Sequence, residues 1–235
     1  MAKIRESNVK NQSGGYRRLF NNKKLGTLLS KCQSACITNG NQLEKIVFND
    51  NIMELGGLDE FINRINNNCN EFSANNVYIA TKKSIKKSNY RITYYDASGN
   101  KREEQPDALI FNVANKTCYI IELKDGDNFD TKKSAGECEM LKKAKEILGP
   151  KIPFKTDFYI CCFNNNDKEA IKKGFKNNFK LNNIITGEEL CKIINKNYND
   201  IINQRNNDAD DNINYFVDEL LKIEYIKQKI IEKLR

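Results

Sequence analysis

The chain has 235 residues, 39% of them hydrophobic, and 39 basic against 31 acidic residues give it a formal net charge of +8. This length allows one domain with a substantial core, and the positive charge suits a polyanionic partner, although it is equally compatible with simple solubility. The chain contains no histidine, which excludes serine triads, cysteine–histidine dyads and histidine-ligated metal sites. Any hydrolytic chemistry must therefore use carboxylates, lysine, tyrosine and metal ions.

No targeting signal is visible in the sequence. No apolar run approaches the length of a membrane span, and residues 1–15 lack the apolar core of a signal peptide. We therefore expect a cytoplasmic protein with no membrane association, in which the eight cysteines are free thiols. The cysteine spacings do not match a zinc site.

Residues 1–25 are rich in lysine and arginine and include Arg17 and Arg18. Two interpretations of this basic N-terminal arm stay open at this stage. It is either a solvated extension or a segment that grips nucleic-acid phosphates.

Hydrophobic periodicity and turn residues predict the elements that follow the arm. Helices are predicted over residues 24–49, with a break near Asn39 and Gly40, and from Leu58 onward. Runs rich in β-branched and aromatic residues predict strands at 76–81, 90–97, 107–113 and 117–123.

The second half of the chain alternates helices and strands. Ser134 and Glu137 stand at capping-box spacing, so a helix is predicted to begin at Ser134 and to end at Gly149 and Pro150. Further strands are predicted at 154–163 and 183–186, and further helices at 167–175, 186–202 and 213–235. The polar run 203–212 is predicted to separate the last two helices.

The strands 107–113 and 117–123 are predicted to form a hairpin with a tight turn at Ala114 and Asn115, because asparagine tolerates a left-handed backbone. Residues whose numbers sum to 229 then face each other. Asp107 and Glu122 therefore lie on the same face of the sheet, with Cβ atoms about 4.5–5.5 Å apart. Strand alternation adds Lys124 to that face, whereas a shift of one residue in register would remove Asp107 from it.

Two carboxylates at this separation repel each other unless a cation lies between them. Mg²⁺ suits such a pair, with Mn²⁺ as an acceptable substitute, and the carbonyl of Leu123 is a further candidate ligand. Lys124 would then orient or help deprotonate an attacking water and stabilise charge on a phosphate. The alternative is that Asp107 merely begins a strand while Glu122 and Lys124 form a surface ion pair.

Pro106 and Asp107, followed by Glu122-Leu123-Lys124 after an apolar strand, resemble the PD-(D/E)XK nuclease motif, and residues 122–137 are similar in particular to type II restriction endonucleases. The resemblance implies an α/β (α+β mixed) fold with a restriction-endonuclease-like core, in which helices flank a central mixed sheet in the order αβββαβ. It also implies metal ligation by Asp107 and Glu122 and a catalytic role for Lys124. Many members carry a further glutamate on the helix before the sheet. Glu44 occupies a similar setting, although it is equally compatible with a solvated helix residue.

The resemblance gives a single nuclease domain over residues 1–235. It comprises the basic arm (1–25), a catalytic core (40–165) and a C-terminal helical part (166–235). Contacts to DNA phosphates are predicted at the start of the helix that follows the catalytic strand and in the arm, at Thr131, Lys132, Lys133, Ser134, Arg17 and Arg18.

The leading hypothesis is a Mg²⁺-dependent type II restriction endonuclease that hydrolyses double-stranded DNA at a specific sequence. Palindromic targets favour a homodimer, and a cognate DNA methyltransferase is expected in the same system. Two alternatives stay open. One is a structure-selective repair or recombination nuclease of the same fold, and the other is a non-catalytic basic nucleic-acid-binding protein.

Overall fold

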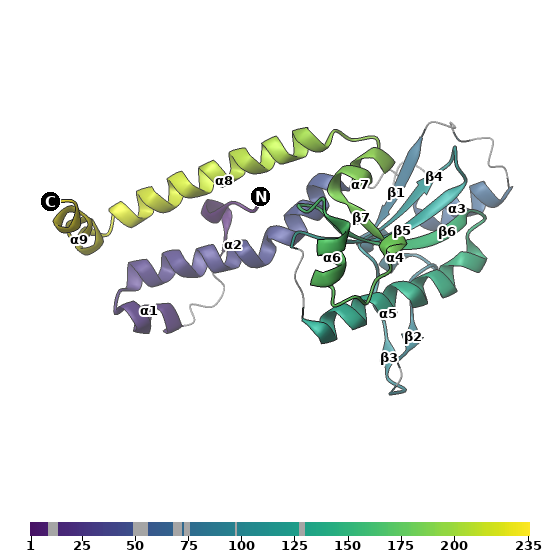
Figure 1. Cartoon of the computed structure of the whole chain (residues 1–235), viewed down its shortest axis with the longest axis horizontal. Coiled ribbons are helices and arrows are strands. Elements are labelled where there is room, and N and C mark those ends of the chain that lie inside the picture. The colour runs from purple at the N-terminus through teal and green to yellow at the C-terminus, as the bar shows by residue number, and fades with distance from the viewer. Residues whose placement is uncertain (9–13, 49–55, 68–71, 73–75, 97, 127–129) are drawn as a thin grey trace. The chain divides into compact units, whose positions relative to one another are not determined.

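The computed structural model describes all residues except 9–13, 49–55, 68–71, 73–75, 97 and 127–129 (Figure 1). The described residues form two compact units, one of residues 44–198 and the other of residues 1–43 with 199–235. Helix α2 (Lys23–Val47) runs through the boundary without the predicted break near Gly40. A glycine inside a helix destabilises the helix by only about 1 kcal/mol relative to alanine, so the neighbouring helical turns are stable enough for α2 to continue through Gly40. No helix of the described part is long and apolar enough to cross a membrane.

The unit of residues 44–198 is built around a five-stranded sheet in the order β1-β4-β5-β6-β7, flanked by helices (Figure 1). The strands are β1 (Val77–Thr81), β4 (Ala108–Asn112), β5 (Thr117–Lys124), β6 (Lys155–Cys162) and β7 (Ile184–Thr186). β1, β4 and β5 pair antiparallel, whereas β5, β6 and β7 pair parallel. With α3 (Leu58–Asn67) before β1 and α5 (Thr131–Leu148) between β5 and β6, the predicted mixed sheet and the order αβββαβ are confirmed.

The hairpin of β4 and β5 has the predicted register, since Ala108 pairs with Ile121 and Asn112 with Thr117. Its turn differs in detail. The left-handed residue is Lys116, with φ +48°, rather than Asn115. Asn115 is instead held by its backbone N–H, which donates to the Asn112 side chain at 3.0 Å. The numbers of paired residues in β4 and β5 still sum to 229, so every side chain lies on its predicted face of the sheet.

The face of the sheet that carries even-numbered β5 residues packs against α3 and α5. Ile120 of β5 belongs to one core cluster with Leu141 of α5 and Phe61 of α3. The rings of Phe61 and Phe111 lie 5.0 Å apart, centroid to centroid. Burying each such side chain contributes about 1.5–3 kcal/mol relative to leaving it exposed. Glu122 and Lys124 follow Ile120 on this face, so they extend from a rigid support.

Of the strand predicted over residues 90–97, only Tyr94–Tyr95 is a strand among the described residues, and it lies outside the five-stranded sheet. The structure has α4 (Lys82–Lys87) after β1 and then a separate two-stranded ribbon of β2 (Tyr94–Tyr95) and β3 (Lys101–Arg102). Residue 97 lies outside the described residues. Gln105 explains part of the difference, because its side chain bonds both the N–H and the carbonyl of Ile92 at 2.8 and 2.9 Å. Those backbone groups therefore need no strand partner.

Helix α5 begins one turn earlier than predicted. Its N-cap is Asp130, whose carboxylate accepts from the backbone N–H of Lys133 at 2.8 Å, and not Ser134. Ser134 lies inside the helix, where the predicted capping box cannot form. The helix ends at Leu148 and continues into the short 3₁₀ turn η4 (Gly149–Lys151), close to the predicted end.

The remaining elements of this unit are α6 (Lys168–Gly174), η5 (Leu181–Asn183) and α7 (Gly187–Ile193). The second unit holds η1 (Ile4–Glu6), α1 (Gly14–Phe20), most of α2, α8 (Tyr198–Leu221) and α9 (Glu224–Leu234). The predicted break over 203–212 is wrong, because α8 continues through this polar run. The helix instead ends at Leu221, and α9 begins at Glu224.

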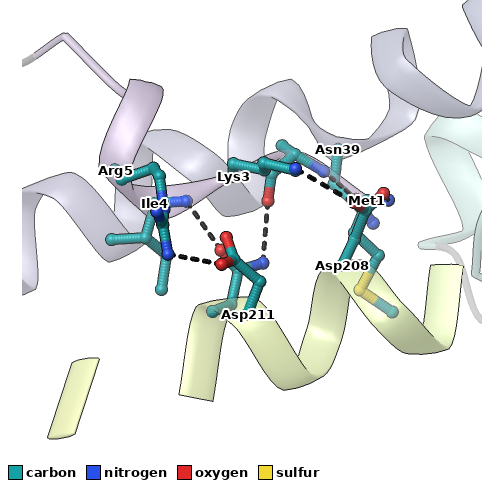
Figure 2. Close-up of polar contacts among 9 residues, drawn as sticks. Met1, Lys3, Ile4, Arg5, Asn39, Asp208 and Asp211 are labelled. Atoms are coloured by element: carbon teal, nitrogen blue, oxygen red, sulfur yellow. Dashed lines mark hydrogen bonds and ion pairs between the residues drawn. The ribbon is translucent and has the colours of Figure 1, made fainter. Parts of the chain in front are cut away.

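Contacts with the chain's first residues explain why that polar run is helical (Figure 2). Asp208 binds the amino terminus at 2.5 Å, and Asp211 pairs with Arg5. The side chain of Asn212 accepts from the N–H of Ile4 at 2.7 Å and donates to the carbonyl of Ala2 at 2.9 Å. Residues 1–5 are thus bound to α8 and do not form the solvated extension that was one interpretation of the arm.

Candidate active site

Asp107 and Glu122 converge at one end of the β4–β5 pair, as the register predicts. Asp107 immediately precedes β4, and both residues are only 4% exposed. One carboxylate oxygen of Asp107 accepts from the backbone N–H of Leu123 at 2.9 Å. This bond fixes Asp107 against β5, directly beside Glu122. The reading of Glu122 as part of a surface ion pair is therefore wrong, because the group is buried.

Glu122 carries a polar atom without a protein partner. Its Oε1 accepts from Lys124 Nζ at 2.6 Å, whereas its Oε2 is buried and has no hydrogen bond in the described structure. Burial, and next the nearby charge of Asp107, raise the pKa of Glu122 well above its usual range, despite the opposing effect of Lys124. Buried carboxylate oxygens are normally paired, so this atom marks a place for a cation or proton.

Lys124 lies between two carboxylates. Its Nζ contacts Glu122 Oε1 at 2.6 Å and Oε1 of Glu137, on α5, at 2.7 Å. Burial acts to lower the pKa of Lys124, but the charges of Glu122 and Glu137 outweigh it and hold this pKa above its usual range. The side chain is therefore a fixed ammonium group at neutral pH.

Lys82, which sequence reasoning missed, contacts Asp107 from the opposite side. Its Nζ lies 3.2 Å from Asp107 Oδ1, and its backbone N–H donates to the Asp107 carbonyl at 2.8 Å. The pairing of β1 with β4 is the feature that would have identified it. Paired residue numbers sum to 189 in this register, so position 82, just after β1, lies opposite position 107. Glu137 was also missed as a site residue, since the spacing that singled it out suggested a cap.

Glu44, at the end of α2, is half-buried and lies within electrostatic range of this cluster. Burial, and next the charge of Asp107, raise the pKa of Glu44, while Lys82 and Lys124 act to lower it. The structure therefore brings Glu44 to the same region as Asp107. Burial would not raise the pKa of a glutamate that is fully solvated on a helix surface.

A cavity of about 460 Å³ opens beside the cluster and is lined by Glu122, Glu137, Lys82 and Lys133, among others. Thr131 and Lys132, which precede Lys133 in the sequence, are exposed at the start of α5. Ser134 is not available to DNA, because it is fully buried and its hydroxyl donates to the carbonyl of Phe175 at 2.5 Å.

Arg17 and Arg18 lie elsewhere. Both are on α1, in the unit of residues 1–43 and 199–235, and both are exposed. They are thus accessible for contact with a polyanion.

The sequence is similar to that of one characterised enzyme over nearly its whole length. It is 42% identical over 223 residues to the type II restriction enzyme HhaII of Haemophilus parahaemolyticus, which is 94% of each chain. No protein-family model matches the sequence, and no solved structure matches it either. Identity at this level over this length favours site-specific cleavage over the structure-selective nuclease and the non-catalytic binder. The chain belongs to the type II restriction enzymes, which are sequence-specific, DNA-binding endonucleases.

Proposed function

We propose that this restriction enzyme cleaves double-stranded DNA at a PD-(D/E)XK centre formed by Asp107, Glu122 and Lys124. The observation that carries the proposal is Glu122 Oε2, a buried carboxylate oxygen without a partner, beside the equally buried Asp107. Two carboxylates in a poorly solvated place require a cation, and their hard oxygens suit Mg²⁺ or Mn²⁺.

The donor set fits a metal ion that is only partly enclosed by protein. Type II restriction enzymes generally need a divalent metal ion. Asp107, Glu122 and the Leu123 carbonyl are the ligands that we propose for it. No group of three or more acidic, cysteine or histidine side chains able to hold a metal occurs among the described residues, which leaves coordination positions for water and substrate phosphate. When bound, such an ion lowers the pKa of water and neutralises charge on the phosphate.

Lys124 supplies a fixed positive charge and hydrogen-bond donors. Glu122 and Glu137 hold its ammonium group in place and keep it protonated. This side chain therefore orients the attacking water and stabilises charge that develops on the phosphate oxygens, and it does not act as a base in this state. Glu44, with its raised pKa, is the better candidate for accepting a proton from water.

DNA would enter along the cavity that Lys133 lines, with Thr131 and Lys132 at the exposed start of α5. Lysine side chains and the N-terminus of a helix both favour phosphate. We assign Arg17 and Arg18 to more distant phosphates. The proposal also retains the homodimer, a cytoplasmic location and a cognate methyltransferase in the same system, because a sequence-specific nuclease endangers the DNA of its own cell.

Digestion of an unmethylated, sequenced plasmid tests this proposal. Wild-type protein with Mg²⁺ should give discrete fragments with ends at one sequence. Lys124→Ala and Asp107→Ala should each slow cleavage by about 10³-fold or more, because each removes charge from the reacting centre. Both variants should keep the wild-type circular dichroism spectrum and bind DNA in a gel-shift assay.

Lys142→Ala is the matched control, because Lys142 is exposed on the same helix as Glu137. This variant should cut at the wild-type rate. Cleavage by Asp107→Ala at the wild-type rate would show that the reaction does not depend on the proposed centre.

A further inference from the structure

The pairing of β1 with β4 brings a second cation to the proposed metal site. Asp107 immediately precedes β4. Extending the β4–β5 register by one residue places Glu122 opposite Asp107, and extending the β1–β4 register by one residue places Lys82 opposite it on the other side. The ammonium of Lys82 lies 3.2 Å from Asp107 Oδ1, and Leu123 N–H occupies the other oxygen. Both oxygens of Asp107 thus have a partner within the protein, and one of these partners is a charged group.

The two lysines of the site differ in how firmly they are held. The Lys124 side chain is 15% exposed and contacts two carboxylates, whereas the Lys82 side chain is 52% exposed and, among the described residues, forms an ion pair with Asp107 alone. Burial acts to lower the pKa of Lys82, and the charges of Asp107 and Glu122 overcome that effect. Lys82 therefore stays charged, but its four-carbon stem is free to move into solvent at a modest energetic cost.

We propose that Lys82 is an internal cation of the metal site, which neutralises Asp107 in the metal-free enzyme and which a divalent ion must displace. This inference rests on the proposed metal ligation by Asp107 and Glu122. A divalent ion beside Asp107 would repel the ammonium, and it interacts with both carboxylates, whereas Lys82 bonds only one. Lys82 is thus a positioning residue that holds the Asp107 carboxylate in place before the metal binds.

Displacement also connects metal binding to DNA binding. Lys82 lines the cavity beside Glu122, together with Lys86 and Lys133. A DNA phosphate in that cavity offers the displaced ammonium a new anionic partner. Metal and DNA should therefore strengthen each other's binding, by the reciprocity that couples any two ligands of one protein.

The affinity of the whole, DNA-free protein for Mn²⁺ tests the inference. It is measured from the loss of the electron paramagnetic resonance signal of free Mn²⁺ on titration with protein. Lys82→Met removes the competing charge, so Mn²⁺ should bind about fivefold more tightly, the equivalent of about 1 kcal/mol for a half-exposed ion pair. Lys82→Arg keeps the charge and should bind Mn²⁺ at close to the wild-type affinity.

Lys86→Met is the matched control, because Lys86 is exposed on α4, lines the same cavity and forms no ion pair within the described part of the chain. This control variant shows what the loss of any one positive charge near the site does to Mn²⁺ binding. Its affinity for Mn²⁺ should differ from that of wild type by less than about twofold. An unchanged or weaker affinity in Lys82→Met would overturn the inference.

A second measurement uses wild-type protein, in case Lys82→Met fails to fold. In protein labelled with ¹⁵N-lysine, the ammonium signal of Lys82, identified by its absence in Lys82→Arg, should shift on addition of Mg²⁺. A signal that does not respond, in protein that binds Mg²⁺, overturns the inference. If wild-type protein takes up no Mn²⁺ with or without DNA, the proposed metal site itself fails, which distinguishes the two cases.

Discussion

Glu122 is the residue at which folding and function conflict. The metal-free fold buries its carboxyl group beside Asp107, and one of its oxygens has no hydrogen bond in the described structure. Lys124 pairs with the other oxygen, but a buried carboxylate with one unpartnered oxygen still opposes folding. A cost of this kind is expected where a cation completes the site.

Removing the charge of Glu122 should stabilise the metal-free protein at neutral pH. The pKa of Glu122 is raised by folding, so above the unfolded value of about 4.3 the native state holds a proton that the unfolded state has lost. Stability therefore falls as pH rises through the window between the unfolded and folded pKa values. Glu122→Gln lacks this titration, and its advantage over wild type should grow as pH rises from 4.5 to 8.

Urea unfolding in EDTA, repeated across that pH range, measures the effect. Glu139→Gln is the control, since Glu139 is exposed on α5 and should follow the wild-type curve. A constant difference between Glu122→Gln and wild type at every pH would show that the carboxyl group does not titrate differently in the two states.

The proximity of Asp107 and Glu122, the proposed catalytic pair, could be predicted from sequence because it depends on local rules. The position of the turn and the alternation of side chains between the two faces of a strand determine which residues of a hairpin face each other. The left-handed residue is Lys116 instead of Asn115, and this difference does not change the register. Lys82 and Glu137 were missed for the opposite reason. Their contacts depend on which distant strand pairs with β4 and on where α5 packs, and neither is encoded in local spacing.

At the scale of elements, the sequence predicted the existence of helices and strands better than their boundaries. The strand expected over 90–97 competes with the Gln105 side chain, which satisfies Ile92 across 13 residues of chain. The polar run 203–212 is helical because Asp208, Asp211 and Asn212 bind residues about 200 positions away. In both cases a distant partner decides the local conformation.

Two glycines of the catalytic unit should respond to alanine in opposite ways. A Cβ at Gly187, the first residue of α7, would lie 2.2 Å from the backbone carbonyl oxygen of Phe163, at the end of β6. The backbone cannot yield as a side chain can, so Gly187→Ala should destabilise the protein by about 1–3 kcal/mol. A Cβ at Gly136, within α5, meets nothing within 4 Å, so Gly136→Ala should stabilise by about 0.5–1 kcal/mol.

Thermal and urea unfolding of the two variants check this pair. Each variant is the control for the other, because both add one methyl group to a helical residue. Equal effects would mean that the close approach of α7 to β6 does not limit the fold.

At the scale of the whole molecule, the unit of residues 1–43 and 199–235 has apolar side chains that its own described residues do not cover. Ile213, Val217 and Leu221 of α8 are 60%, 44% and 41% exposed. They are spaced by four residues and therefore form one stripe along the helix. Apolar stripes of this kind commonly mark protein–protein contacts. The homodimer proposed for this enzyme requires such a contact, and a two-fold axis would place the stripe against its own copy.

Charges on this stripe should therefore produce monomers. Val217→Glu with Leu221→Glu would bury four like charges in a symmetric contact, and sedimentation velocity should show a monomer where wild-type protein is a dimer. Gln204→Glu with Asn207→Glu adds the same charge at exposed polar positions of α8 that lie off the stripe, and this variant should stay dimeric. A single copy carries one catalytic centre, so the monomer should nick supercoiled plasmid where the dimer linearises it. A dimeric Val217→Glu/Leu221→Glu variant would place the contact elsewhere, and monomeric wild-type protein with linearising activity would contradict the homodimer.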